Sequence, residues 1–313
     1  DVDVGPDGRI HVLINEVATD RIAGFPQIRP PRIDDLVAIL SPDGQELKRV
    51  NLLHAMARSP YARLLSTVPW YTTRDNGDYL HTNTVNVLDG TRTAKLPEAG
   101  PGRVLLSFRE INAIAILDID REEIVWATRG PWLRQHDPDL LANGNILLFD
   151  NQGHVGPGGV TRLIEFDPAT RQVVWSYAGT AQERFESEVR SSQERLPNGN
   201  TLITESDGGR LFEITPAGET VWSYTNPVRG GSEGELIPIV AWAQRIDPDV
   251  LTADFRALVL GSEADNASGG TNPRVQAEGR GRAVPIMQSR VTMAASSSSL
   301  QPSVAAGRSG TTR

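Results

Sequence analysis

Side chains suited to group transfer occur at the start or end of several apolar segments. His81 and Asn83 open the segment HTNTVNVL, Arg109 follows VLLSF, and His136 lies in QHDPDLL. A neutral imidazole is a nucleophile that can split a transfer reaction into two easier steps. An arginine offers a planar fork of donors that matches an oxyanion, and an amide adds a further hydrogen bond. Together, these residue types can transfer a group that carries negatively charged oxygens.

Internal repeats indicate how the chain positions these residues. The repeats run from Gly102 to Gly130, from Gln135 to Gly179 and from Ser191 to Pro227. Their register is marked by three tryptophans spaced 49 and 47 residues apart, Trp126, Trp175 and Trp222. We interpret the tryptophans as anchors that pack one repeat against the next. A repeat of this length, built from short strands, is typical of propeller blades.

Turn signals divide each repeat into strands. Asn143-Gly144 and Asn198-Gly199 each lie between two apolar runs. Asn-Gly favours a two-residue type I′ hairpin turn, because both residues accept a positive φ. Further turns are expected at Asp167-Pro168 and after Pro216. The predicted fold class is therefore all-β, a β-propeller of four-stranded antiparallel blades.

The domain prediction assigns residues 1–260 to the propeller, with the clearest blades at 78–130, 135–179 and 191–227. Strands near Arg9–Asn15, Leu36–Leu40 and Leu47–Leu52 predict a further blade, and a strand around Ile237–Arg245 would begin or close another. The best helical stretch, Leu53–Leu65, is interrupted by Pro60.

The segment 261–313 is rich in Ser, Gly, Ala and Arg and lacks periodic apolar positions. Such a composition cannot bury enough surface to offset chain entropy. We predict a low-complexity, disordered tail there; a frame-shifted end is the alternative.

The repeat arrangement predicts that the functional side chains share one cavity. The innermost strand of each blade lines the central channel, and equivalent positions of successive blades meet near one axis. We therefore expect His81, Asn83, Arg109 and His136 to face a common space, although they are far apart in sequence.

Composition excludes several function classes. The net charge is −8 and no basic cluster is visible, which argues against nucleic-acid binding. No apolar run reaches the roughly 18 residues of a membrane-spanning helix. There are no cysteines, and the five histidines lack metal-ligand spacing, so we expect no disulfide and no metal site. The chain starts at Asp1 without a leader, so we expect a processed protein or a fragment.

Four segments resemble the successive signatures of the arylsulfotransferase family of bacterial β-propellers. They are LHTNTV, SFREINAIAILDID, QHDPDLLANGNILLFDN and RLPNGNTLITES, and the resemblance covers roughly residues 78–227. It implies that His136 is the nucleophile that becomes transiently sulfated, and that His81, Asn83 and Arg109 bind the sulfuryl group. It also implies six blades, whereas the repeats here account for four or five. We thus expect an incomplete propeller, a shortfall that a truncated N-terminus would explain.

The activity implied by the resemblance is transfer of a sulfuryl group from an aryl sulfate to a phenolic acceptor through a sulfohistidine, independent of PAPS and without a cofactor. The resemblance further implies a periplasmic or secreted protein. The family motif often reads Arg-His-Gln where this chain has Arg109, Glu110 and Ile111, which places an acid beside the arginine. Some members carry another sulfate-binding histidine upstream; we do not transfer that role to His54.

Alternative interpretations concern both the function and single residues. A non-catalytic propeller that binds ligands or partners is the main alternative, and EFDPATRQVVWSY resembles a blade motif of quinone-cofactor dehydrogenases. In the alternative interpretation, His136 is a structural histidine. The alternative role of Arg109 is to pair with a carboxylate such as Asp137. Trp132 either anchors a blade or stacks on an aryl substrate.

Overall fold

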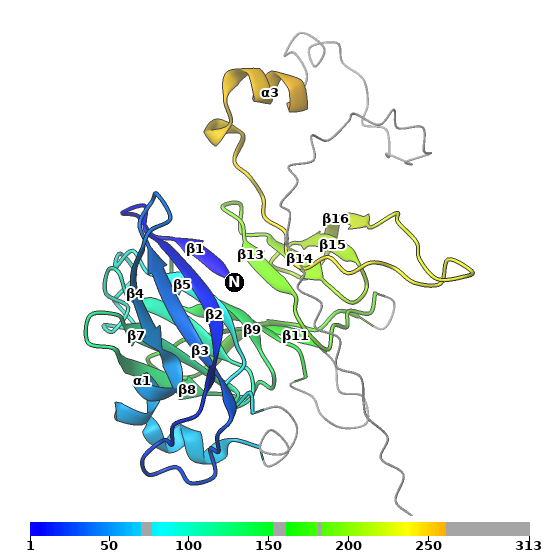
Figure 1. Cartoon of the computed structure of the whole chain (residues 1–313). Coiled ribbons are helices and arrows are strands. Elements are labelled where there is room, and N and C mark those ends of the chain that lie inside the picture. The colour runs from blue at the N-terminus through cyan, green and yellow to red at the C-terminus, as the bar shows by residue number, and fades with distance from the viewer. Residues whose placement is uncertain (70–76, 153–160, 181–182, 261–313) are drawn as a thin grey trace, which may run out of the picture. The chain divides into compact units, whose positions relative to one another are not determined.

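The computed structural model describes residues 1–69, 77–152, 161–180 and 183–260 (Figure 1). The chain divides into two units, Asp1–Val250 and Leu251–Arg313. The described part of the second unit contains one helix, α3 (Ala253–Leu260). The tail predicted for 261–313 lies outside the described residues. All further description concerns the first unit.

Sixteen strands of the described chain form four antiparallel sheets of four strands, each a meander in chain order. Sheet A contains β1 (Val2–Val4), β2 (Ile10–Ala18), β3 (Arg32–Leu40) and β4 (Glu46–Asn51). Sheet B contains β5 (Thr82–Val87), β6 (Val104–Phe108), β7 (Ala113–Asp118) and β8 (Glu123–Arg129). Sheet C contains β9 (His136–Leu140), β10 (Ile146–Asp150), β11 (Arg162–Phe166) and β12 (Val173–Tyr177). Sheet D contains β13 (Ser192–Arg195), β14 (Thr201–Glu205), β15 (Arg210–Ile214) and β16 (Thr220–Thr225).

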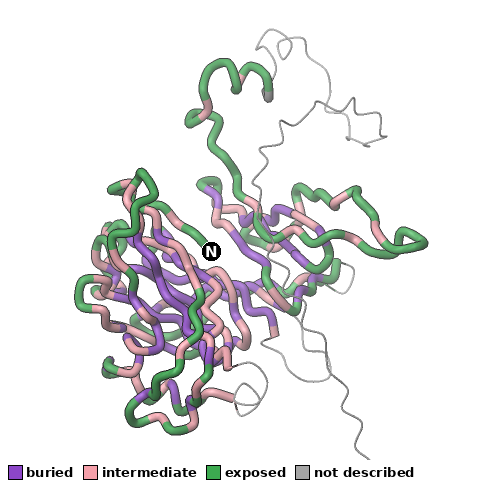
Figure 2. The backbone as a smooth tube through the Cα atoms, in the orientation of Figure 1, coloured by how far each residue is buried: buried purple, intermediate pink, exposed green. Residues whose placement is uncertain are grey.

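Continuous apolar runs in the middle strands are explained by cores on both faces of each sheet. In β6, Val104 and Leu106 pack into a core shared with sheet A, whereas Leu105 packs into a core shared with sheet C. In β10, Leu148 packs toward sheet B and Leu147 toward sheet D. Because neighbouring strand residues point to opposite faces, every residue of such a strand is buried. The buried strands appear in purple in Figure 2.

The four sheets are connected through their first strands. β1 contacts β5, β5 contacts β9, and β9 contacts β13. Side chains bridge these neighbours: Asp3 Oδ2 accepts a hydrogen bond from the Val87 nitrogen at 2.7 Å, and Asn86 Nδ2 donates to the Pro138 carbonyl at 2.9 Å. Sheets that share cores and contact in chain order through their first strands are the blades of a β-propeller. The predicted fold class is confirmed.

The hairpin at Asn143 differs from the predicted two-residue type I′ turn. The Leu141 nitrogen donates to the Asn145 carbonyl at 2.8 Å, and the Gly144 nitrogen donates to the Leu141 carbonyl at 2.9 Å. The loop therefore has three residues, and its positive φ of 77° falls on Gly144 rather than on Asn143. This is a type I turn closed by a left-handed glycine, which only a residue without Cβ adopts easily. The same pair of bonds recurs at Gly8, Gly44, Gly199 and Gly218.

The helical segment follows its prediction. α1 (Leu52–Arg58) and the short 3₁₀ helix η1 (Ala62–Thr67) lie on either side of Pro60, and Asn51 Oδ1 caps α1 by accepting from the His54 nitrogen at 2.9 Å. A second 3₁₀ turn, η2, spans Pro248–Val250. No helix in the described part of the chain is long and apolar enough to cross a membrane.

The strand predicted around Ile237–Arg245 does not form. Side chains of sheet D hold this segment instead: Ser206 Oγ donates to the Val240 carbonyl at 2.6 Å, and Arg245 Nη2 pairs with Glu213 Oε2 at 2.5 Å. The prediction was wrong because these contacts fix the segment at separate points and leave no ladder of backbone hydrogen bonds.

Candidate active site

A cavity of about 620 Å³ lies where the first strands of the sheets begin. Three of the four predicted site residues, His81, Asn83 and His136, line it. Its other walls come from the β1 segment, from β9, from the start of β13 with the residues before it, and from the segment after β16. They include Asp1, Asp3, Asp137, Arg190, Ser192 and Trp242. The predicted convergence of blade starts on one space therefore holds for the two histidines and the asparagine.

The contacts of His136 fix the tautomer of its ring. Nδ1 lies 2.7 Å from Asn151 Oδ1 and 3.1 Å from the Arg134 carbonyl. Asn151 presents its oxygen there because its Nδ2 donates to the carbonyls of Ser187 at 3.0 Å and Arg190 at 2.9 Å. Both atoms near Nδ1 are acceptors, so Nδ1 carries the hydrogen and Nε2 carries the lone pair.

The surroundings of His136 keep the ring neutral. Burial lowers its pKa to about 4, against the hydrogen bond to Asn151, and the positive charge of Arg109 and the proximity of His81 act in the same direction as burial. A lowered pKa means that the imidazole is unprotonated at neutral pH. His136 therefore combines a defined lone pair with a place on the cavity wall, as a nucleophile requires.

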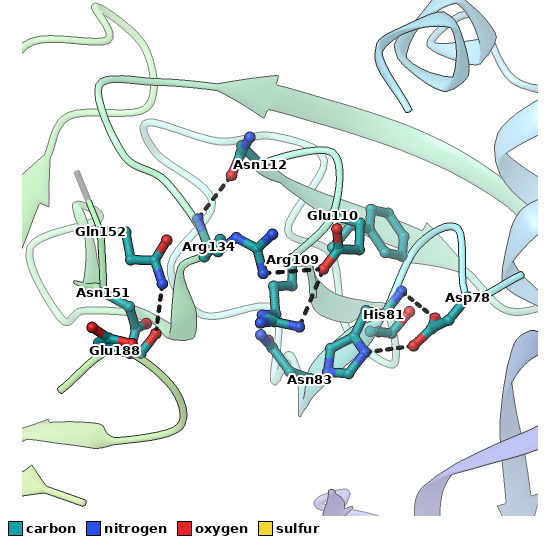
Figure 3. A network of polar contacts seen from close by, with 12 residues as sticks. Asp78, His81, Asn83, Arg109, Glu110, Asn112, Arg134, Asn151, Gln152 and Glu188 are labelled. Carbon is teal, nitrogen blue, oxygen red and sulfur yellow. Dashed lines mark hydrogen bonds and ion pairs between the residues drawn. The ribbon is translucent and has the colours of Figure 1, made fainter. Parts of the chain in front are cut away.

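His81 is oriented by a neighbouring carboxylate. Its Nδ1 lies 2.5 Å from Asp78 Oδ2, and its backbone nitrogen donates to Asp78 Oδ1 at 3.0 Å (Figure 3). This loop conformation gives His81 a positive φ of 49°. The second ring nitrogen, Nε2, is then the atom that His81 can present to a ligand in the cavity.

Arg109 lies close enough to His136 for its charge to lower the pKa of that ring. Its guanidinium is not part of the cavity lining, and Nη1 pairs with Glu110 Oε1 at 3.1 Å (Figure 3). Arg134 Nη1 lies 3.5 Å from the same oxygen. The carboxylate partner of Arg109 is thus Glu110, and the suggested pairing with Asp137 is wrong. The acid that replaces the family's usual histidine after this arginine holds the guanidinium by an ion pair.

Both inner strands that carry site residues begin irregularly. The pairing of β5 with β6 shifts between Thr82 and Thr84, so Asn83 is the extra residue. Asn83 lines the cavity, and its Nδ2 donates to the Gln135 carbonyl at 2.8 Å. The pairing of β9 with β10 shifts directly after His136. Such β-bulges bend a strand and re-aim its side chains, and they are frequent beside active sites.

Two supporting residues were missed from the sequence. Asn151 directly follows β10, just as Arg109 directly follows β6 in the preceding repeat. Because the two residues occupy equivalent positions of successive repeats, Asn151 could have been predicted from the sequence. Asp78 precedes β5 by only a few residues, and the His81-Asn83 motif alone gave no indication of it.

Trp132 is a packing residue. It is 2 % exposed, its ring centroid lies 5.1 Å from that of Phe166, and its Nε1 donates to the Asn112 carbonyl at 3.1 Å. The stacking role suggested for Trp132 is therefore wrong, and the blade-anchor role is correct. The tryptophan that lines the cavity is Trp242, which is 60 % exposed.

His54 lies at a separate polar cluster. Its Nε2 is 3.2 Å from Asp20 Oδ2, and potential ligand atoms of Asp20, Asp34 and His54 lie within 4.8 Å of one another. Arg32 already occupies this cluster, because its Nε lies 2.6 Å from Asp34 Oδ1 and its Nη2 lies 3.0 Å from Asp20 Oδ1. An internal guanidinium neutralises the acids where a metal ion would have to bind.

The chain is similar to several solved structures at low sequence identity. A Bacteroides caccae protein of unknown function is 14 % identical with a TM-score of 0.37, over 69 % of this chain and 57 % of that one. Virginiamycin B lyase from Staphylococcus aureus is 10 % identical with a TM-score of 0.36, over 72 % and 69 %. The Dos1 propeller is 10 % identical with a TM-score of 0.38, over 73 % and 47 %. The chain thus spans about half of two of these proteins, and likenesses this distant carry no functional argument.

No curated protein matches the chain significantly. The family model described as arylsulfotransferase (ASST) matches residues 1–227. This match extends the resemblance at residues 78–227 through sheet A to the N-terminus, and it includes every residue of the site except Ala241 and Trp242. The chain therefore belongs to the arylsulfotransferase family.

Proposed function

We propose that this protein transfers a sulfuryl group from an aryl sulfate to a phenolic acceptor, through a covalent sulfohistidine at Nε2 of His136. One observation carries the proposal: the hydrogen bond from Nδ1 to Asn151 leaves the lone pair on Nε2 of a neutral ring that lines the cavity. Family membership supports the general reaction class.

The first half-reaction forms an N–S bond between His136 and the sulfuryl group and breaks the S–O bond to the aryl oxygen. The ring keeps its Nδ1 hydrogen and becomes a positively charged imidazolium bonded to the negatively charged sulfonate, and Asn151, as a neutral acceptor, stabilises the ring charge only modestly. The sulfuryl group therefore remains easy to transfer. In the second half-reaction a phenol oxygen attacks sulfur and the electron pair returns to Nε2.

The sulfuryl oxygens would be held by His81 and Asn83, which line the cavity, while the positive charge of Arg109 acts on the site from outside the lining. Fixed donors of this kind stabilise charge that develops in a transition state, and removal of one typically lowers the rate about 10²–10³-fold.

The direct test is incubation with 4-nitrophenyl sulfate and a phenol. We expect release of nitrophenolate, formation of the sulfated acceptor, and ping-pong kinetics. Without acceptor, intact-mass measurement should show a gain of one SO₃ that maps to His136. Wild-type turnover by a folded His136→Ala variant would contradict the proposal.

A non-catalytic propeller that binds sulfated ligands is the second candidate. The ion pair between Glu110 and Arg109 favours it over catalysis, because a guanidinium held by a carboxylate is less able to stabilise the negative charge that develops during transfer. A trapped sulfo-adduct on the wild-type protein would exclude this candidate, whereas binding of an aryl sulfate without phenolate release or adduct would support it.

A further inference from the structure

Asp137, the residue that follows His136 in the sequence, also lines the cavity and is ionisable. We propose that the carboxyl group of Asp137 donates a proton to the departing phenolate and later takes the proton of the incoming phenol. This inference rests on the proposed sulfuryl transfer, and it assigns the proton transfers that the nucleophile cannot perform.

The backbone turns Asp137 toward the same space as His136. Adjacent residues of a regular strand point to opposite faces of the sheet. At Asp137, φ is 52°, and the register shifts from His136 opposite Phe149 to Asp139 opposite Leu147. This bulge allows His136 and Asp137 to line one cavity. A left-handed non-glycine residue is unfavourable, and such positions gather at functional sites.

Hydrogen bonds hold the Asp137 carboxyl in place. Its Oδ2 accepts from the Gln193 nitrogen at 3.0 Å, and its backbone carbonyl accepts from Gln193 Nε2 at 2.5 Å. The first bond continues the series of bridges between first strands, so Asp137 also has a structural role. An amide at this position could still accept from the Gln193 nitrogen, and this separates the two roles in experiments.

The surroundings of Asp137 favour its protonated form. Burial raises its pKa to about 7, against the Gln193 hydrogen bond, and the charge of Glu194 on β13 raises it further. Burial also raises the pKa of Asp139, two residues along β9, and the charge of Asp137 adds to that effect. The other charged or titratable residues of the cavity wall are Asp1 and Asp3 on the β1 side, His81 and His136, and Arg190 before β13. A carboxyl that titrates near neutral pH can both give and receive a proton.

The proton balance closes over the two half-reactions. As Nε2 of His136 bonds to sulfur and the S–O bond breaks, the aryl oxygen takes the proton of Asp137, which becomes a carboxylate. The acceptor phenol then gives its proton to this carboxylate while its oxygen bonds to sulfur and the N–S bond breaks. Both residues return to their starting forms without a further reactant.

The test measures the effect of Asp137→Asn on turnover of two different sulfate donors. Phenyl sulfate leaves as a basic phenolate, with a pKa near that of tyrosine at about 10, whereas 4-nitrophenolate needs little protonation. General acid catalysis typically raises the reaction rate about 10²–10⁴-fold. We expect kcat/KM for phenyl sulfate to fall by that order, and kcat/KM for 4-nitrophenyl sulfate to fall less than about tenfold. A loss of equal size for both donors would show that Asp137 acts only structurally.

Asp139→Asn is the matched control. Asp139 lies on the same strand and also has a raised pKa, but it lines a neighbouring cavity rather than the one that holds His136. We expect this replacement to change kcat/KM for the two donors by the same factor. Selective loss with phenyl sulfate in this variant would move the proton donor from Asp137 to Asp139.

The pH profile gives a second, independent measurement that needs no Asp137 variant. For wild-type protein, kcat/KM for phenyl sulfate should fall as pH rises through the pKa of Asp137, and Glu194→Gln should move this alkaline limb to lower pH. A flat wild-type profile would overturn the proton-transfer role. Absence of any sulfo-adduct or phenolate release from wild-type protein would instead mean that the proposed function has failed.

Discussion

Oδ1 of Asn151 lies 2.7 Å from Nδ1 of His136, and both hydrogens of the same amide bond to carbonyls of the loop before β13. The orientation of the amide is therefore set by the loop that leads into sheet D, although the histidine belongs to sheet C. A side chain that determines which nitrogen of a histidine is reactive is as important to the site as the ring itself.

Replacement of Asn151 by Ala should remove the acceptor that keeps the ring hydrogen of His136 on Nδ1, so that both tautomers are populated. Loss of a group that orients a reactive histidine typically costs about 10–100-fold in activity, and we expect kcat with 4-nitrophenyl sulfate to fall in this range. Nitrogen-edited NMR should show the hydrogen on Nδ1 in the wild type and a mixture of tautomers in Asn151→Ala. A variant with full activity and an unchanged spectrum would contradict the role of Asn151.

Glu110 should restrain the affinity for sulfate esters. In Glu110→Gln the ion pair with Arg109 is lost, the guanidinium becomes available to the substrate, and we expect KM for 4-nitrophenyl sulfate to fall several-fold. Arg109→Ala should lower kcat/KM about 10²–10³-fold. Arg109→Lys should recover part of this loss, because an ammonium restores the positive charge but lacks the planar fork. An unchanged KM in Glu110→Gln would mean that the ion pair does not limit binding.

The proposed activity should persist to a lower pH than the pKa of an ordinary histidine would allow. Burial lowers the pKa of His136 to about 4, so the nucleophile remains unprotonated well below pH 6.5. With 4-nitrophenyl sulfate, kcat/KM should stay level from neutral pH to about pH 5 and decline near pH 4. Proton NMR titration of the ring should give the same midpoint, and an activity loss centred near pH 6.5 would contradict the lowered pKa.

The same shift has a consequence for stability. The unfolded chain binds a proton at His136 below about pH 6.5, whereas the folded chain does so only near pH 4. The folded state is therefore destabilised as pH falls through this interval, and the effect is absent above it. In His136→Asn, thermal unfolding should show a smaller loss of stability between these pH values than in the wild type.

Arg32 should be needed for folding rather than for catalysis. It is 1 % exposed and pairs with the equally buried Asp34, so Arg32→Met leaves an uncompensated carboxylate. Removal of one partner of a buried pair typically costs about 3–5 kcal/mol in the free energy of unfolding. Combining Arg32→Met with Asp34→Asn should recover part of that loss in urea titrations. A single variant as stable as the wild type would show that the pair is dispensable.

The fold could be predicted because its determinants are local and repeated. The runs VLLSF and ILLFD, the regularly spaced tryptophans and the Asn-Gly turns together identified four-stranded blades. The type of turn was missed because an Asn-Gly pair does not show whether two or three residues close the hairpin. The segment after β16 was misjudged because an apolar stretch shows nothing about available strand partners.

The site could be predicted only in part. Repeat register placed His81, Asn83 and His136 on one cavity, since equivalent blade positions meet near one axis. The partner of Arg109 and the packing of Trp132 depend on side-chain contacts between distant segments, which no spacing shows. The exposure of Asp137 on the same cavity as His136 depends on a bulge and a left-handed residue, and neither has a signature in QHDPDLL.

Each core layer is shared by two sheets, and none belongs to a single blade. In a linear array of this kind, stability is a sum over neighbouring pairs, and a defect is transmitted to the next pair. The proposed nucleophile, His136 on sheet C, is oriented by Asn151, whose amide donates to carbonyls that precede sheet D. Loosening the layer between these sheets, for example at Phe212, should therefore be detected first as a loss of catalytic alignment, before the protein unfolds.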